Sequence, residues 1–148
     1  MSQTIPFSGP VLVARRGGLL LALPVGAVGN ASGAWCTPPP PWSPAWVAGL
    51  AMRDDGVHPV VDALPDGVAP APRQQRLLIL ATTTPAWALV IDGVEGMGTA
   101  TAGGGLLPRL TLPSAWAQVG RLGDGRAVVL IVPQQIAAHL AGTLAVAS

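Results

Sequence analysis

The chain has 148 residues, of which 50% are hydrophobic and 10% are charged, and its formal net charge is +1. Its cationic side chains are all arginines and form no basic patch, which argues against nucleic acid or an anionic membrane surface as a partner. Prolines interrupt the apolar runs before they reach the length of a membrane span, about 18 residues, so we expect no membrane insertion.

We expect a single domain over residues 1–148, with residues 1–9 as a loose terminus. The 19 glycines and 16 prolines are spread along the chain, which disfavours long helices and favours short strands joined by turns. The only cysteine, Cys36, has no second thiol for a disulfide, which indicates a reducing, cytoplasmic compartment.

The first two predicted strands, residues 11–14 and 19–25, form a hairpin whose turn is Gly17-Gly18. The pair Arg15-Arg16 and the apolar residues after it also imitate a secretory signal. An exported small β-domain is therefore an alternative, although Pro24 splits the apolar stretch that such a signal needs.

A weaker strand is predicted over residues 27–35, followed by a connector over residues 37–44. Four consecutive prolines in this connector favour polyproline II geometry. Its tryptophan, Trp42, is the best candidate for an exposed aromatic anchor that binds a partner.

Residues 46–62 predict a β-hairpin, because two apolar runs flank a short charged turn. Asp55-Gly56 suits a tight turn with positive φ. Pro59 has no backbone N–H, which places the second strand at a sheet edge or a bulge. Charges at the tip of this hairpin interrupt an uncharged region, so an interaction role for Arg53, Asp54 and Asp55 stands beside the alternative that they are simply solvated.

Two apolar runs, residues 77–81 and 87–94, predict a second hairpin, and their continuity indicates strands that are covered on both faces. Residues 119–122 and 127–132 predict a third. A short helix is expected over residues 133–141, closed by Gly142. Together these elements predict a mainly β fold of two small β-barrels with a short C-terminal helix.

The sequence offers little chemistry for catalysis or metal binding. His58 and His139 are the only histidines, and neither lies in a nucleophile or metal-ligand motif. The glycines at 103–105 lack the helix and lysine of a phosphate-binding loop. We therefore expect no enzyme activity, no cofactor and no metal. Asp62 and Asp92 each follow an apolar strand, and we expect their carboxylates to accept backbone N–H bonds.

Several motifs in order resemble the CheW-like domains of bacterial chemosensory systems. Residues 46–49 (Trp-Val-Ala-Gly) match the strand before the family's turn, residues 59–62 (Pro-Val-Val-Asp) match the strand after it, and residues 91–94 (Ile-Asp-Gly-Val) match its second half. The residues that carry this structural motif are Gly49, Pro59, Val60, Asp62 and Asp92.

The resemblance implies two five-stranded barrel subdomains packed together and a short C-terminal helix. It also implies a cytoplasmic, non-catalytic adaptor that acts in two-component signal transduction, in chemotaxis or twitching motility. Such an adaptor binds the regulatory domain of a CheA-type histidine kinase and the cytoplasmic tip of a chemoreceptor. A barrel of this family that binds another protein, a small ligand or single-stranded nucleic acid is the alternative.

The chain departs from the family pattern at charged positions that the family associates with partner contacts. Asp54 and Asp55 stand where the family usually has arginine and glycine, and Gly29-Asn30 stand where many members have an acidic residue. The departures from the family pattern, together with Trp42 of the proline-rich connector, give the candidates for partner binding: Asn30, Trp42, Arg53, Asp54 and Asp55.

Overall fold

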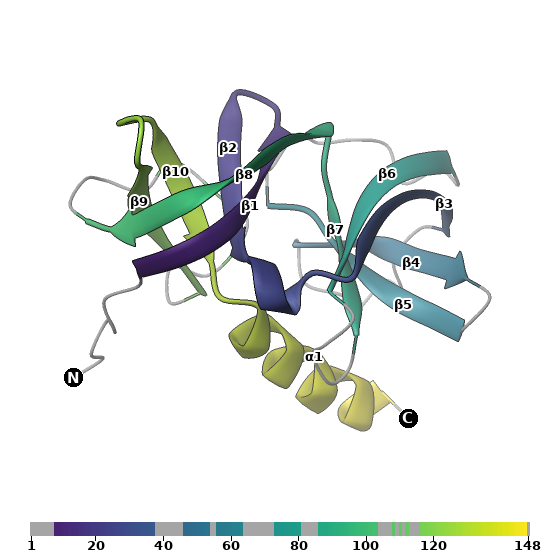
Figure 1. The fold of residues 1–148 in the computed structure, drawn as a ribbon. Coiled ribbons are helices and arrows are strands. Elements are labelled where there is room, and N and C mark those ends of the chain that lie inside the picture. The colour runs from purple at the N-terminus through teal and green to yellow at the C-terminus, as the bar shows by residue number, and fades with distance from the viewer. Residues whose placement is uncertain are drawn as a thin grey trace.

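Two closed five-stranded β-barrels and one α-helix make up the described part of this computed structural model (Figure 1). The structure describes residues 8–37, 46–53, 56–63, 73–80, 86–103, 108, 110, 112 and 116–147. The predicted mainly β fold, with two packed barrels and a C-terminal helix, is confirmed.

Barrel 1 joins strands from both ends of the chain, in the order β1-β2-β10-β9-β8. Its strands are β1 (Ser8–Arg16), β2 (Leu19–Pro24), β8 (Gly93–Ala102), β9 (Ala117–Leu122) and β10 (Ala127–Ile131). β1 begins inside the terminal segment that was expected to be loose. The residues after Arg15-Arg16, which imitate an export signal, form β2 and the 3-10 turn η1 (Val25–Ala27).

Barrel 2 is a continuous insertion between β2 and β8, in the order β3-β4-β5-β7-β6. Its strands are β3 (Asn30–Thr37), β4 (Val47–Arg53), β5 (Gly56–Val61), β6 (Arg73–Leu80) and β7 (Trp87–Val90). Each barrel contains one short parallel pairing, β10 with β2 in barrel 1 and β5 with β7 in barrel 2. The other pairings are antiparallel.

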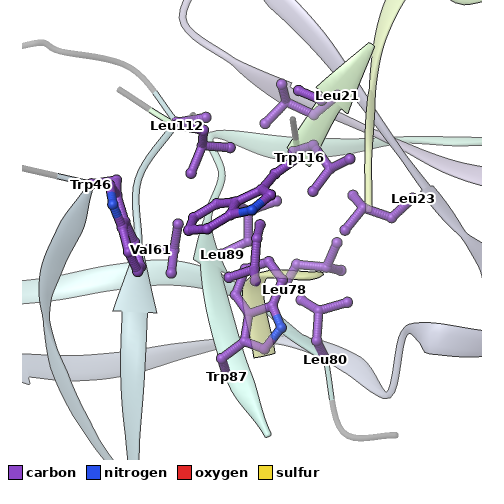
Figure 2. Packing of buried hydrophobic residues seen from close by; sticks show 14 of the residues in the cluster. Leu21, Leu23, Trp46, Val61, Leu78, Leu80, Trp87, Leu89, Leu112 and Trp116 are labelled. Carbon is purple, nitrogen blue, oxygen red and sulfur yellow. The ribbon is translucent and has the colours of Figure 1, made fainter. Parts of the chain in front are cut away.

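Successive side chains of the apolar strands point alternately into a barrel and into a core between the barrels. In β7, Ala88 and Val90 fill barrel 2, whereas Trp87 and Leu89 lie between the barrels. In β2, Ala22 points into barrel 1 and its two leucine neighbours point into the shared core. Figure 2 shows this shared core, with tryptophans and leucines from both barrels in contact. The continuous apolar runs are thus strands with two covered faces, as predicted.

The helix α1 (Pro133–Ala147) closes the shared core from one side (Figure 1). Ile136 and Leu140 are buried against the core, and Trp87 Nε1 donates a hydrogen bond of 3.3 Å to the carbonyl of Pro133. The predicted helix end at Gly142 is wrong, because the helix continues to Ala147. A glycine inside a helix costs about 1 kcal/mol relative to alanine, and the leucines and alanines around it outweigh that cost.

One predicted strand, residues 87–94, is two strands in the structure. β7 ends at Val90 in barrel 2, and β8 starts at Gly93 in barrel 1, so the chain crosses between barrels at Ile91-Asp92. The rest of β8 was not predicted, because glycine and alanine have low strand propensity. Pairing with β1 along nearly its whole length holds this segment extended.

The described residues contain no helix that is long and apolar enough to span a membrane.

Candidate protein-interaction site

The β4–β5 hairpin presents two apolar side chains to solvent. Met52 and Val57 lie directly opposite each other in the antiparallel register, and they are 57% and 50% exposed. Facing side chains of such a pair are about 5 Å apart, so the two make one apolar patch. An exposed pair of this kind is a candidate contact for a protein partner.

This end of the hairpin extends beyond the neighbouring strands of barrel 2. β3 pairs with β4 only at Leu50 and Ala51, and β7 pairs with β5 only at Val60 and Val61. Within the described residues, the Met52–Val57 pair therefore belongs to a two-stranded ribbon with no third strand beside it. Such a ribbon offers both side chains and backbone groups to a partner.

Gly49 and Pro59 shape the base of this ribbon. The register shifts between Val47 and Gly49, which is a β-bulge, and Gly49 adopts a φ of 155° that glycine favours. The N–H of Asp62 points towards the first strand of the hairpin, because it donates to the carbonyl of Trp46. Backbone N–H positions alternate in direction along a strand, so the nitrogen of Pro59, three residues earlier, points away from β4. The missing N–H of Pro59 therefore costs no bond in the hairpin ladder.

The structure gives only partial positions for the predicted partner-binding residues. Trp42, Asp54 and Asp55 lie outside the described residues. For the other two, only the backbone is described: Arg53 ends β4 opposite Gly56, and Asn30 begins β3 opposite Ile79 of β6. The described pairings thus do not bring Asn30 and Arg53 together.

Asp62 and Asp92 connect the two barrels. Arg16, in the first hairpin of barrel 1, donates two hydrogen bonds to the carboxylate of Asp62, of 2.9 and 2.6 Å. Asp92 accepts the backbone N–H of Gly17 at 2.5 Å, and its other oxygen lies 3.8 Å from Arg16 Nη1. Asp92 therefore accepts the kind of backbone bond that was expected, whereas Asp62 is engaged by a buried guanidinium.

An aromatic cluster joins the same two barrels to the helix. The ring centroids of Trp46, at the start of β4, and Trp116, before β9, are 5.1 Å apart and nearly perpendicular. His139 of α1 lies 5.5 Å from Trp46 and 5.0 Å from Trp116. Figure 2 shows Trp46 at the edge of the shared core and Trp116 among its leucines. His139 thus packs against both tryptophans.

A second exposed apolar stretch lies on β8 of barrel 1. Val94 is 40% exposed and Met97 is 68% exposed. Sequence reasoning missed Met97, because that part of β8 was not predicted, and it placed Val94 in a strand without predicting its exposure. The signal was nevertheless present, since Met97, Thr99 and Thr101 alternate with glycines and an alanine, as on a strand with one outward face.

The charges near this stretch are paired with each other. Arg15 Nε lies 3.2 Å from Glu95 Oε1, and Arg126 Nε lies 2.8 Å from Asp124 Oδ2. The backbone N–H of Arg126, together with its side chain, lowers the pKa of Asp124 below the ordinary value. Within the described residues, no group of three His, Cys, Asp or Glu side chains is placed to hold a metal ion.

No protein-family model matches the sequence, and no curated protein matches it. Among solved structures, the chain is similar to the crystal structure of the scaffolding protein TtCheW from Thermoanaerobacter tengcongensis, with a TM-score of 0.60 and 15% sequence identity. The match covers 84% of this chain and 89% of that chain. The two barrels, their order along the chain and the C-terminal helix are therefore a divergent CheW-like fold.

Proposed function

We propose that this chain is a non-catalytic adaptor that couples chemoreceptors to a CheA-type histidine kinase in the cytoplasm. The observation that carries the proposal is the structural similarity, over most of both chains, to a protein described as a scaffold. The Trp-Val-Ala-Gly, Pro-Val-Val-Asp and Ile-Asp-Gly-Val motifs support it independently, because they resemble the family in sequence and order.

The projecting β4–β5 ribbon is the surface that we assign to the kinase regulatory domain. Full burial of Met52 and Val57 contributes about 1.5–3 kcal/mol for each side chain. Together the two side chains contribute at most about 3–6 kcal/mol, which is less than the roughly 8 kcal/mol of a micromolar complex, so neighbouring residues must add contacts. The candidates Trp42, Arg53, Asp54 and Asp55 are proposed as these additional contacts, whereas Asn30, which pairs with Ile79 at the other end of β3, is proposed as a separate partner contact.

The altered turn predicts which charge the kinase surface carries. With two adjacent aspartates at positions 54 and 55, the tip favours a partner that presents arginine or lysine at this point. Such charge complementarity selects the partner and raises the association rate more than it raises the affinity. A cognate kinase from the same cell is therefore the appropriate binding partner for the test.

The test is a titration of the purified chain against the regulatory domain of its cognate kinase and against a receptor-tip fragment. We expect micromolar or tighter binding to the kinase domain. Replacing both exposed ribbon residues (Met52→Asp and Val57→Asp) should weaken that binding at least tenfold, because two charges would be buried without partners.

The matched control is Met97→Asp, which places the same charge on an exposed methionine of barrel 1. It should leave kinase binding within twofold of the unsubstituted chain. If the chain binds neither the kinase domain nor the receptor-tip fragment, the adaptor proposal is wrong. If Met97→Asp weakens kinase binding as much as the double variant Met52→Asp and Val57→Asp does, the assignment of the ribbon to the kinase is wrong.

A further inference from the structure

The outer edge of β8 has a stretch without a neighbouring strand. β8 pairs with β1 from Gly93 to Thr101, but it pairs with β9 only at Ala100, Thr101 and Ala102. Within the described residues, no strand flanks residues 94–98 on the side away from β1. Among the described strands, β8 and β9 are therefore paired at one end of the seam between them and unpaired at the other.

Backbone groups of Met97 point out of this open seam. The carbonyl of Thr99 accepts the N–H of Gly123, and the N–H of Gly103 donates to the carbonyl of Val119. The backbone N–H and carbonyl groups of the odd-numbered residues in this part of β8 therefore point towards β9. Alternation along the strand then turns the N–H and the carbonyl of Met97 in the same direction. Its side chain, 68% exposed, stands on the outer face of the barrel.

A hollow of about 290 Å³ lies beside this edge; Val13, Gly96, Gly98 and Leu122 line it, together with the charged residues Glu95, Asp124 and Arg126. The two glycines leave the inward side of β8 without side chains. A Cβ built at Gly98 would approach only Leu122 Cδ2, at 3.8 Å, and one at Gly96 would meet nothing within 4 Å. The hollow thus has room for side chains that belong to another segment.

We propose that the open edge of β8 binds an extended, uncharged peptide segment of a protein partner, which adds a strand to barrel 1. The N–H and carbonyl of Met97 bond to the peptide backbone, and alternate apolar side chains of the peptide enter the hollow. This site is independent of the ribbon in barrel 2 and of the identity of the kinase.

The charges and the size of the edge decide which occupant fits. Glu95 and Asp124 are each paired with an arginine, so the rim attracts neither a basic nor an acidic peptide strongly. A stable dimer buries about 1,200–2,000 Å², which an edge of five residues cannot supply. A short peptide segment bound reversibly therefore fits the edge better than a second copy of the chain.

The experiment uses an acetylated and amidated hexapeptide of alternating valine and threonine, added to the full chain. We expect saturable binding, together with slower hydrogen exchange at the Met97 amide. A second peptide, with the same side chains but with N-methyl groups on the backbone nitrogens that face β8, should bind at least tenfold more weakly. Equal binding of both peptides, or an unchanged Met97 amide, would overturn the proposal.

A variant of the chain tests the same contact from the other side. Met97→Pro removes the outward N–H and takes no bond from the ladder with β1, so it should lower affinity for the valine–threonine peptide at least tenfold. Gln134→Ala, at an exposed position of α1 outside both proposed binding surfaces, should leave the affinity unchanged. If Met97→Pro unfolds the chain, the N-methylated peptide still decides the question. Concentration-dependent dimerisation that is abolished by the peptide would assign the edge to a second copy and overturn the proposal.

Discussion

Barrel 1 and barrel 2 have the same number of strands but offer different surfaces to a partner. Barrel 2 projects a hairpin whose exposed groups are the side chains of Met52 and Val57. Barrel 1 has a glycine-rich strand, β8, whose open edge offers backbone groups around Met97. Side chains select a partner by shape and charge, whereas a strand edge accepts many sequences. The two barrels therefore suit different kinds of partner.

The same barrels are alike where they face each other. Both contribute every second side chain of their inner strands to the shared core, and the helix α1 covers it. An ion pair, Arg16 with Asp62, crosses the junction beside this apolar core. The variants below separate what the shared core, the ion pair and the interior of one barrel each contribute to stability.

The largest loss of stability should follow substitution of Trp87 in the shared core. Trp87 is fully buried, and its indole N–H bonds to the carbonyl that starts α1. Trp87→Ala should lower the free energy of unfolding by about 3–5 kcal/mol, because it leaves a large cavity between the barrels. Trp87→Phe should cost less, since most of the ring volume stays. Urea denaturation measures both, and a loss below about 1 kcal/mol for Trp87→Ala would show that the barrels are stable without their junction.

A smaller loss should follow removal of Asp62, which leaves the guanidinium of Arg16 without its bidentate partner. Removing one member of a fully buried ion pair lowers the free energy of unfolding by about 3–5 kcal/mol. The side chains of Arg16 and Asp62 keep exposures of 11% and 10%, so we expect a smaller loss of about 2–3 kcal/mol for Asp62→Ala. A double-mutant cycle with Arg16→Met measures their coupling. The exposed pair of Arg126 and Asp124 is the matched control and should show much weaker coupling; equal coupling would contradict a special role for the junction.

The smallest loss should come from adding a methyl group inside barrel 1. A Cβ at Gly120 of β9 would lie 2.7 Å from Leu130 Cδ1 and 3.1 Å from the carbonyl oxygen of Thr101, so Gly120→Ala should cost about 1–2 kcal/mol. Gly98→Ala, on the neighbouring strand, meets no such obstacle and should be neutral. Thermal unfolding of the two variants compares them directly. A larger loss at Gly98 would contradict the open seam beside β8.

The apolar pattern predicted the mainly β class and most of the hairpins, whereas the packing of two five-stranded barrels was implied by the family resemblance. The runs in β6 and β7 are continuous because each strand faces both a barrel and the shared core, and the Asp-Gly turns mark hairpins at β4–β5 and β9–β10. β8 was missed because its glycines carry little strand propensity, so its extended state depends on β1, which lies far away in the sequence. The helix end was missed because Gly142 is only a permissive stop signal, and the helix continues past it to Ala147.

The candidate site was less predictable than the fold. The turn charges at Arg53, Asp54 and Asp55 were visible as an interruption of an uncharged region. The exposure of Met52 and Val57 was not, because it depends on where β3 and β7 stop pairing with the hairpin. The link between Arg16 and Asp62 joins residues 46 positions apart, and no local pattern contains it.

The insertion of barrel 2 into barrel 1 has a consequence for synthesis on the ribosome. All strands of barrel 2 are available once β7 has emerged, whereas barrel 1 lacks three of its strands until β8, β9 and β10 follow. During that interval the outward faces of β6 and β7, including the indole of Trp87, have no cover. A nascent chain with such an apolar face is a substrate for chaperones, and it becomes fully protected only when the final helix docks.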